Sequence, residues 1–302
     1  MAGTDLVVSE VGLGCNNFGA RLDLGQTRAV VEAALDAGIT FLDTADIYGN
    51  GGSSERYLGE ILEGRRDEVV IATKFGWDLM SDTNELRGSA AYAKQAIEAS
   101  LERLRTDYVD LYYYHRPDGM TPFEETLGAM HEIVVEGKAR HIGCSNLTAE
   151  QLREVSDISG RTGGSPIVAL QNEYSLLERS PEEEVLPLCR ELGVGFVPYF
   201  PLASGLLTGK YRRGEPAPSG SRLEGRNDRL TGERFDRVEE LARFAEARGH
   251  TLLELAIGAL ASTPGVASVI AGATTPEQAR ANAAAGSWKL SADDLEAVSA
   301  LQ

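Results

Sequence analysis

The sequence has few of the residues that build metal centres or disulfide frameworks. Its 302 residues include three cysteines, Cys15, Cys144 and Cys189, which lie far apart and are odd in number. Its four histidines show no metal-ligand spacing. We therefore expect no metal site, and the cysteine usage favours a reducing, cytoplasmic location.

Long apolar runs and an excess of positive charge are also missing. No run approaches the roughly 18 consecutive apolar residues of a membrane span, and residues 1–6 lack the basic and apolar regions of a secretory signal. Asp and Glu number 46 against 29 Lys and Arg, so the net charge is −17. Because such a field repels phosphates, we predict neither a nucleic-acid nor a membrane partner.

The chain has no internal repeat, no low-complexity tract and no linker that would divide it. No Gly-x-Gly-x-x-Gly motif follows a strand-like run, which excludes a Rossmann domain as the source of dinucleotide binding. Barrels of alternating strands and helices often run about 200 to 300 residues as one unit. We therefore predict a single domain over residues 1–302.

Eight short apolar runs alternate with longer helical segments along the whole chain. The runs are almost continuously apolar, which is typical of parallel strands covered on both faces. Eight strands alternating with about eight helices predict an α/β fold, a (β/α)8 TIM barrel. The expected strands are Val7–Leu13, Ile39–Leu42, Val69–Thr73, Val109–Tyr114, Ala139–Cys144, Ile167–Gln171, Val194–Tyr199 and Val266–Ile270.

Helix starts are indicated by capping boxes, in which Ser or Thr precedes Glu or Gln by three residues. These boxes begin at Thr121, Thr148, Ser180, Thr251 and Thr275. Two departures from simple alternation are expected. A loop rich in Gly, Pro and Arg occupies residues 203–230, and two helices, 233–248 and 251–262, precede the eighth strand, with a last helical segment at 291–301.

The loop after the seventh strand carries a local positive charge in an acidic protein. Between residues 210 and 229, six cations stand against three anions. This composition indicates a candidate anion site, with an ordinary solvated loop as the alternative. The cations are Lys210, Arg212, Arg213, Arg222, Arg226 and Arg229.

Reactive side chains stand where several of the expected strands end. In a barrel of this kind the active site lies at the carboxyl ends of the strands. Lys74 ends a strongly apolar strand, where an ammonium is costly unless it is paired, and Asp43 on the neighbouring strand is the expected partner. A buried ion pair that only satisfies itself is the alternative.

A tyrosine and a histidine at the same face favour a catalytic role for this pair. A free phenol has a pKa of about 10, and a nearby ammonium lowers it by stabilising the phenolate. We expect Lys74 to tune Tyr48 as a general acid, with His115 assisting the proton transfer or orienting a carbonyl oxygen. Taken singly, each of the two could equally be a core or surface residue.

A series of motifs in a fixed order resembles the aldo-keto reductase family over nearly the whole chain. Each motif is weak alone, and the complete order is specific. The motifs are GLG (Gly12–Gly14), FLDTADIYG (Phe41–Gly49), Ser54–Glu55 with Leu58–Gly59, the strand ending at Lys74, DLYYYHRP (Asp110–Pro117), GKARHIGCSN (Gly137–Asn146) and QNEY (Gln171–Tyr174).

The resemblance implies a catalytic tetrad of Asp43, Tyr48, Lys74 and His115. Tyr48 would donate the proton, Lys74 would lower its pKa, Asp43 would hold Lys74, and His115 would orient a small-molecule carbonyl substrate. The hydride would come from a reduced nicotinamide, because no side chain can supply one.

The resemblance also implies a set of cofactor contacts. Ser145, Asn146 and Gln171 would bind the nicotinamide carboxamide, and Tyr199 would stack on the ring. The segment from Phe200, Pro201 and Leu202 to Tyr211 would wrap the pyrophosphate, with Lys210 and Arg222 as cationic phosphate contacts. Gly272, Thr274, Gln278 and Asn282 would surround the adenosine 2′-phosphate at a helix N-terminus.

The last of these regions bears on the choice of cofactor. Many relatives carry Lys or Arg at the positions of Gly272 and Gln278, and Gln278 is also the third residue of its own capping box. Thr274, Asn282 and Arg222 remain available for a phosphate, so NADPH is the expected cofactor and NADH is not excluded.

Three functions compete at this point. The first is an NADPH-dependent carbonyl reductase, whose substrate mouth we expect near Asn17, Trp77, Tyr114 and the 203–230 loop. The second is a nucleotide-binding regulatory subunit, since the chain also resembles potassium-channel β subunits; those have asparagine at the position of His115, and the histidine here favours turnover. The third is a Schiff-base aldolase acting through Lys74.

Overall fold

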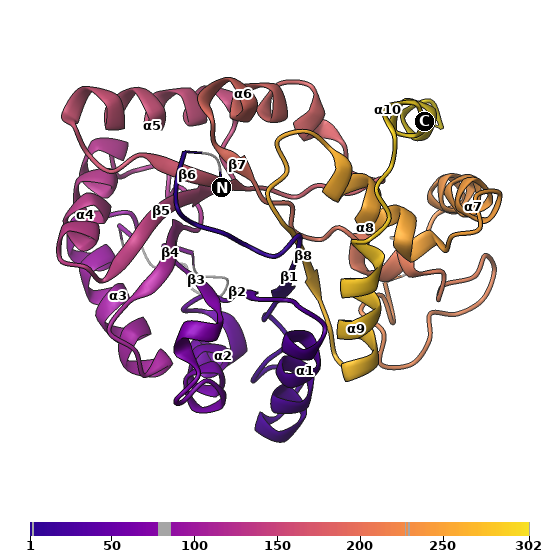
Figure 1. Ribbon diagram of the computed structural model, residues 1–302, viewed down its shortest axis with the longest axis horizontal. Coiled ribbons are helices and arrows are strands. Elements are labelled where there is room, and N and C mark those ends of the chain that lie inside the picture. Colours follow the sequence, from indigo (N-terminus) through magenta and orange to yellow (C-terminus); the bar gives the residue numbers. More distant parts are fainter. Residues whose placement is uncertain (2, 78–85, 227, 229, 302) are drawn as a thin grey trace.

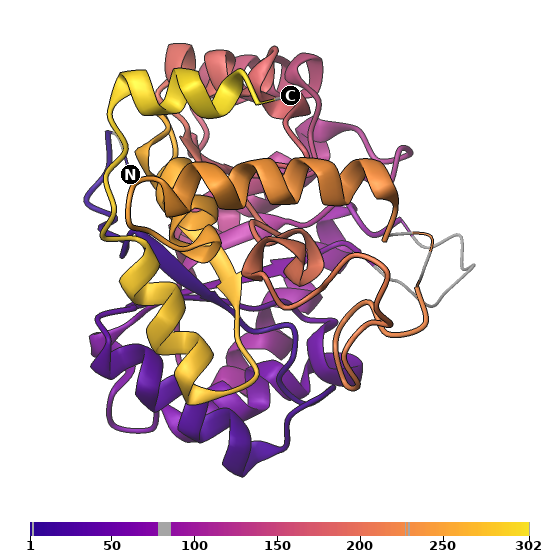
Figure 2. The same cartoon turned by 90° about the vertical axis from the view of Figure 1, so that its right-hand side faces the viewer.

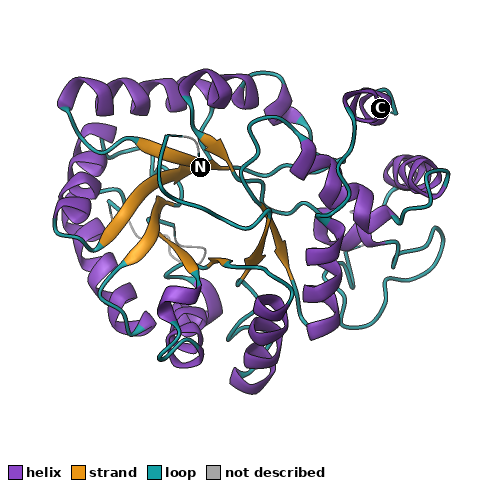
Figure 3. Cartoon of the chain, in the orientation of Figure 1, coloured by secondary structure: helices purple, strands orange, loops and turns teal. Residues whose placement is uncertain are grey.

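The computed structural model describes residues 1, 3–77, 86–226, 228 and 230–301. In this part of the chain, eight parallel strands form one curled sheet with helices around its outside (Figures 1 and 3). The strands are β1 (Val11–Gly14), β2 (Phe41–Asp43), β3 (Val70–Phe75), β4 (Val109–Tyr114), β5 (Ala139–Ser145), β6 (Ile167–Gln171), β7 (Gly195–Phe196) and β8 (Val269–Gly272). The α-helices are α1 (Leu24–Asp36), α2 (Tyr48–Ile61), α3 (Ala90–Leu104), α4 (Phe123–Val135), α5 (Ala149–Thr162), α6 (Val185–Leu192), α7 (Gly232–Glu246), α8 (Leu252–Ser262), α9 (Pro276–Ala285) and α10 (Ala292–Ser299). Short 3₁₀ helices are η1 (Arg66–Glu68), η2 (Ser180–Glu182) and η3 (Ala203–Thr208).

The sheet follows the order of the sequence and closes on itself. Its strand order is β7-β6-β5-β4-β3-β2-β1-β8, and the pairs are parallel. Isolated parallel bridges join Phe196 to Val266 and Tyr199 to Ile270, linking the two edges. The predicted (β/α)8 barrel is therefore confirmed, and the carboxyl ends of all its strands meet at one face.

Two apolar clusters pack against the strands, one on each face of the sheet. Between the sheet and the helices lies a large apolar cluster, and inside the barrel a smaller one contains Phe41, Leu111 and Tyr113 from three different strands. Leu6 from the N-terminal segment packs into this inner cluster, and Figure 1 shows that segment crossing the ring of strands. The interior is thus a packed core, so polar chemistry is confined to the strand ends.

The first strand is shorter than its sequence predicts. The expected strand began at Val7, but Val7 is 79% exposed and β1 begins at Val11. Before it, the Ser9 hydroxyl accepts the backbone N–H groups of Thr40 and Phe41 at 3.1 and 3.2 Å. A side chain therefore replaces the backbone ladder here, and the chain turns so that Leu6 can enter the barrel.

The seventh strand is also shorter than expected. The prediction ran from Val194 to Tyr199, whereas β7 contains only Gly195 and Phe196. Pro198 has no N–H to donate to a ladder, and only its carbonyl pairs, accepting the N–H of Ile270 at 3.0 Å. This end of the barrel is therefore held by single bridges rather than by a regular strand pair.

The insertion after β7 is anchored by its own apolar cluster. Leu206, Leu207, Tyr211 and Leu223 pack with side chains of α7 and α8, including Phe235. Figure 2 shows the insertion as the orange loop that runs past the indigo and purple N-terminal elements before it enters α7. The insertion is thus anchored against α7 and α8 by apolar contacts. Asn227 and Arg229 of this loop lie outside the described residues.

Three of the five predicted capping boxes begin helices whose first residue they cap, and two do not. Those at Thr148 and Thr251 are present in full, and Thr275 caps α9 with its side chain. The predictions at Thr121 and Ser180 were wrong, because α4 begins at Phe123 without a side-chain cap and Ser180 opens a 3₁₀ helix. Among the described helices, none has both the length and the apolar character needed to cross a membrane.

Candidate active site

An ion pair between β2 and β3 lies at the centre of the polar face. Lys74 is completely buried, and its Nζ donates to Asp43 Oδ2 at 2.7 Å and to the Thr44 carbonyl at 2.8 Å. The other carboxylate oxygen, Asp43 Oδ1, accepts from Gln171 Nε2 at 2.9 Å. Burial alone would lower the pKa of Lys74, but Asp43 and Tyr48 raise it above its ordinary value. The ammonium is therefore retained, because both oxygens of its counter-ion are hydrogen-bonded.

The start of α2 brings Tyr48 beside this pair. Gly49, Asn50, Gly51 and Gly52 directly after it have φ angles of 71°, 58°, 85° and 92°, a left-handed region that glycine and asparagine enter most readily. A Cβ added to Gly49 would lie 2.4 Å from the Phe18 carbonyl oxygen. This crowded left-handed turn reverses the chain immediately after Tyr48 and fixes where the phenol points.

The phenol is held in its neutral form. Lys74 Nζ lies 5.1 Å from the centroid of the Tyr48 ring, and two of its three N–H groups are used by Asp43 and Thr44. Burial raises the pKa of Tyr48 more than the nearby ammonium lowers it, so the net shift is upward. This corrects the net lowering expected from the sequence: Lys74 acts in the expected direction, but desolvation outweighs it.

His115 lies against the phenol from β4. The two rings meet edge to face with centroids 5.9 Å apart, and only 3% of His115 is exposed. Burial and the charges of Lys74 and Arg116 hold its pKa well below the ordinary value, so the imidazole is neutral. Its buried Nδ1 has no hydrogen-bond partner in the described part of the chain. The predicted tetrad is thus gathered at one point, with a polar atom of His115 left unsatisfied.

A buried network under the tetrad has no counterpart in the sequence reasoning. Glu55 is completely buried, accepts from Arg103 Nε at 2.6 Å and also accepts from the Thr73 hydroxyl. Thr73 precedes Lys74 on β3, and Gly52 rests on Arg103, since an added Cβ would lie 2.5 Å from its Nε. In the sequence, Ser54–Glu55 stands only as one of the family motifs, and no role is assigned to Glu55.

Asp46 belongs to the same region. Its backbone N–H donates to the Lys74 carbonyl at 3.1 Å, while its Oδ1 is buried without a hydrogen bond among the described residues. Burial, with a smaller effect from Glu55, raises the pKa of this carboxyl to about 7. A carboxyl two residues from Tyr48 is therefore poised to change charge near neutrality.

The three residues expected around the carboxamide form one hydrogen-bonded group with Tyr199, which was expected to stack on the nicotinamide ring. Asn146 Nδ2 donates to the His115 carbonyl and to Ser145 Oγ, both at 3.0 Å, and its Oδ1 accepts from the Tyr199 hydroxyl at 2.8 Å. Ser145 Oγ donates to the Gln171 carbonyl at 2.7 Å. The Gln171 side chain itself donates to Asp43, so it connects this group to the tetrad.

The chain then enters a strained turn. Phe200, Ala203 and Ser204 all have left-handed φ angles, of 55°, 45° and 60°, which non-glycine residues adopt only where the surroundings enforce it. Pro201 is buried and Leu202 half-buried within this turn. Lys210 folds back over it, because a Cβ on Gly205 would lie 2.8 Å from Lys210 Nζ. The predicted phosphate loop therefore has a fixed, unusual backbone with one ammonium above it.

Cations from two parts of the chain meet beside this turn. Arg222 Nη2 donates to Asn17 Oδ1 at 3.3 Å, and its guanidinium lies 5.3 Å from the centroid of the Phe200 ring. Arg21, which the sequence reasoning missed, donates to the Gly220 carbonyl. Burial and the Arg21 charge lower the pKa of Arg222. Two like charges held together in this way favour an anion between them.

Not every cation of the predicted positive loop contributes to that cluster. Arg213 is used elsewhere, donating to Asp236 at 2.6 Å and to Glu239 at 3.0 Å on α7. Arg229 lies outside the described residues. The positive charge counted in this loop is therefore unevenly distributed, and Arg222 is the loop residue that meets Arg21 from the N-terminal part of the chain.

The end of β8 and the start of α9 hold the remaining predicted residues. Gln278 Oε1 accepts from the backbone N–H and the hydroxyl of Thr274 at 2.8 and 3.0 Å, so Gln278 ties the loop to the helix. Asn282 is buried and donates to the Gly272 carbonyl at 3.3 Å. Gly272 and Gln278 are exposed. Asn17, which donates to the Ala273 carbonyl, lies beside Gly272, since a Cβ added there would be 3.5 Å from Asn17 Nδ2.

Two of the residues expected at the substrate mouth lie elsewhere. Tyr114 is 1% exposed and stacks on Phe75 with centroids 5.4 Å apart, so its aromatic surface belongs to the core. Asn17 is buried beside Arg222. Trp77, by contrast, is half-buried and meets the His115 ring edge to face at 4.8 Å. Of the three, only Trp77 stands beside the reactive group.

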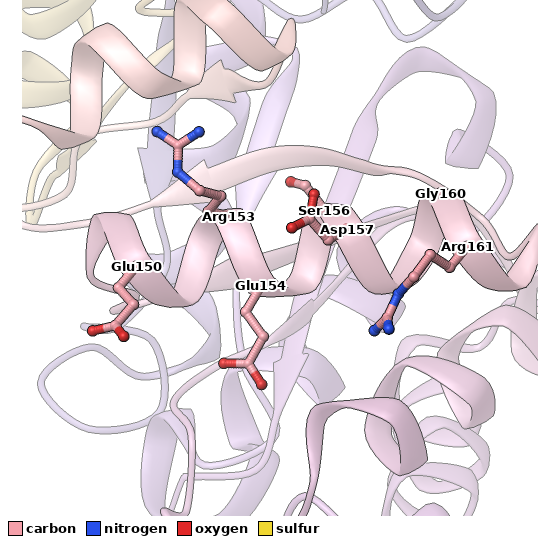
Figure 4. A pocket seen from close by; sticks show the side chains of 7 residues that line it. All are labelled: Glu150, Arg153, Glu154, Ser156, Asp157, Gly160 and Arg161. Carbon is pink, nitrogen blue, oxygen red and sulfur yellow. The ribbon is translucent and has the colours of Figure 1, made fainter.

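A surface hollow on α5 is distinct from these strand ends (Figure 4). Its lining comes from the exposed side of one helix, and its arginines face carboxylates: Arg153 lies 3.6 Å from Glu191, and Arg161 lies 3.7 Å from Glu124. Because it lies on the outer side of one helix and both of its arginines pair with carboxylates, it is not part of the site at the strand ends. The hollow is lined by Glu150, Arg153, Glu154, Ser156, Asp157, Gly160 and Arg161.

Comparison with known proteins places these observations in a family. The model of the "Aldo/keto reductase family" matches residues 10–302. A "Probable voltage-gated potassium channel subunit beta" of Oryza sativa subsp. japonica is 38% identical over 270 residues, covering 86% of this chain and 82% of the relative. A protein of the same description from Arabidopsis thaliana is 37% identical, with 88% and 83% covered. "Probable aldo-keto reductase 1" of Glycine max is 37% identical over 304 residues, with 96% and 84% covered.

Proposed function

The chain belongs to the aldo/keto reductase family, and on that premise we propose that it reduces aldehyde or ketone carbonyls to alcohols with NADPH. The oxidoreductase class follows from the family. The observation that carries the specific proposal is the meeting of Tyr48, the Lys74–Asp43 pair and a neutral His115 at one end of the barrel. A site with an acid, an ammonium and a hydrogen-bonding imidazole suits the reduction of a carbonyl.

The residues present fit a nicotinamide cofactor. Asn146, Ser145 and Tyr199 form a polar, half-buried group next to His115 that would hold the carboxamide and the ring. The fixed turn at Phe200–Leu202 with Lys210, and the guanidiniums of Arg222 and Arg21, would hold the phosphates. When bound, the reduced nicotinamide supplies the hydride to the carbonyl carbon.

The chain's own residues then manage the oxygen of the substrate. The raised pKa of Tyr48 keeps the phenol protonated at neutral pH, so it can donate a proton to the carbonyl oxygen. Lys74 lies where it would stabilise the phenolate that remains, and Asp43 keeps Lys74 charged and oriented. His115 is neutral, so its ring would contribute a hydrogen bond to the carbonyl oxygen without a competing positive charge.

We propose NADPH over NADH because two arginines converge near Asn17. Arg222 and Arg21 repel one another, as the lowered pKa of Arg222 reflects, and a 2′-phosphate would relieve that repulsion. Gly272, Thr274, Gln278 and Asn282 border the same place and would contribute backbone and hydroxyl donors rather than charge. The cofactor preference therefore depends on the arginines.

A nucleotide-binding regulatory subunit is the second candidate. Two relatives are described as potassium-channel β subunits, and nucleotide binding without rapid turnover would use the same cofactor residues. The complete tetrad, with His115 beside Tyr48, favours turnover instead. Steady reduction of any carbonyl compound over many turnovers would decide between them.

The aldolase alternative is disfavoured by the state of Lys74. A Schiff base requires a free amine, whereas the pair with Asp43 raises the pKa of Lys74 and keeps the ammonium. We also propose that residues 1–302 act as one domain in a reducing cytoplasm, where the three buried free cysteines would remain thiols.

A panel of carbonyl compounds tests the proposed function. NADPH oxidation is followed by its absorbance with aldehydes, ketones, sugars and quinones, in parallel with NADH. We expect turnover of at least one carbonyl class, with NADPH favoured. NADPH binding without oxidation by any member would contradict the reductase and support the regulatory subunit.

A further inference from the structure

A guanidinium that has no ion pair among the described residues directly follows His115 of the tetrad. Arg116 directly follows His115, and its side chain is exposed. Its guanidinium lies 5.7 Å from the centroid of the Trp77 ring. In the described part of the chain Arg116 forms no ion pair, whereas other surface cations, such as Lys94 and Lys138, do.

The aromatic rings form a continuous path from the reactive phenol to this cation. Tyr48 contacts one side of His115 at 5.9 Å, and Trp77 contacts His115 at 4.8 Å. Arg116 then lies over Trp77. A carbonyl oxygen placed between Tyr48 and His115 would leave the rest of a short substrate running along the indole, with its far end at the guanidinium.

The charge of Arg116 acts on both sides of this path. It disfavours protonation of His115 and stabilises the ionised form of Tyr199, so its field covers the reactive end of the barrel. Glu173 acts on Tyr199 in the opposite sense. In a protein of net charge −17, an anionic substrate is repelled at long range, and a local unpaired cation is what would bind it at the site.

We propose that Arg116 binds the anionic end of the substrate, so that the preferred substrates are short carbonyl compounds with a terminal carboxylate. The proposal rests on the carbonyl-reductase function and adds a substrate class to it. Guanidinium is suited to this role because its fork can donate two parallel hydrogen bonds to a carboxylate, and Trp77 holds it in place through its ring face.

Two aldehydes of equal chain length test the proposal. Succinic semialdehyde carries a terminal carboxylate, and butanal is its uncharged counterpart. For the unmodified protein we expect a higher kcat/KM for succinic semialdehyde. Arg116→Gln should lower that value about tenfold, mainly through KM, and leave the kcat/KM for butanal within about twofold. Arg116→Lys keeps the charge but loses the forked guanidinium. Its kcat/KM for succinic semialdehyde should lie between the values of the unmodified protein and of Arg116→Gln.

Arg237→Gln is the matched control, because Arg237 is exposed on α7 and its loss changes the net charge equally. It should leave the ratio of the two kcat/KM values unchanged. If the protein reduces butanal and Arg116→Gln leaves the ratio unchanged within twofold, the role of Arg116 is wrong and the reductase function stands. If it reduces neither aldehyde nor any carbonyl of the wider panel, the proposed function fails first and the inference with it.

Discussion

Replacing Arg103 by methionine should destabilise the buried network that supports the turn after Tyr48. Glu55 is completely buried and has two partners, Arg103 and Thr73. Among the described residues Arg103 is the one cation bonded to Glu55, so Arg103→Met leaves a buried carboxylate with one hydroxyl. Breaking a buried pair in this way typically costs about 3 to 5 kcal/mol, and because Arg103 is partly exposed we expect about 3 kcal/mol.

The assay is a double-mutant cycle on the free energy of unfolding in urea. Glu55→Gln alone removes the carboxylate, and the double variant removes both charges without leaving one unpaired. We expect the double variant to be less destabilised than the sum of the single variants by about 1 to 3 kcal/mol. A loss below about 1 kcal/mol for Arg103→Met, or strict additivity, would refute the reasoning.

The same variant should slow turnover without weakening the cofactor. Gly52 rests on Arg103 and ends the left-handed turn that follows Tyr48. Loss of that support should displace the phenol, and a shift of about 1 Å can cost on the order of 100-fold in rate. We expect kcat to fall at least about tenfold with the Kd for NADPH within twofold. An unchanged kcat would show that the turn keeps its shape without Arg103.

Three further substitutions test other parts of the site. Lys74→Met should lower kcat by about 100-fold or more, because the phenolate loses its neighbouring cation; an unaffected rate would exclude that role. Arg222→Ala should raise the Kd for NADPH about tenfold more than that for NADH, and equal changes would move the 2′-phosphate contact elsewhere. Asp46 has a pKa of about 7 in the folded chain, raised by burial, so the folded state holds a proton that the unfolded state releases. The free energy of unfolding should therefore decrease by up to about 1 kcal/mol per pH unit as the pH rises from 4 to 7. Asp46→Asn should remove that slope in urea titrations, and a slope that persists would assign it to another group.

The fold was predictable because its signals are local and repeated. The apolar runs at 109–114 and 167–171 coincide with β4 and β6, since a strand buried on both faces leaves an unbroken apolar run. The strand ends that were predicted wrongly, those of β1 and β7, depend on contacts with residues distant in the sequence. Ser9 interrupts the ladder by bonding the backbone of β2, and the periodicity around Val7 contains no trace of that contact.

The structure brings together the four side chains that were predicted for the tetrad, but the pKa of one of them differs from the prediction. Asp43, Tyr48, Lys74 and His115 were placed together by strand ends and by family resemblance. The net pKa of Tyr48 was not, because it depends on how much desolvation opposes the ammonium, and a sequence carries no measure of burial. Arg103 and Arg21 were missed because their partners are distant in the sequence. Arg103 pairs with Glu55, about 50 positions away, and Arg21 acts on Arg222, about 200 positions away.

Tyr48→Phe is the measurement that tests the central claim most directly. The substitution removes only the hydroxyl and keeps the ring that packs against His115. We expect kcat for an aldehyde that the protein reduces to fall by about 100- to 10,000-fold, while the Kd for NADPH, measured by fluorescence, stays within twofold. Turnover within tenfold of the unmodified protein would contradict the assignment of Tyr48 as proton donor.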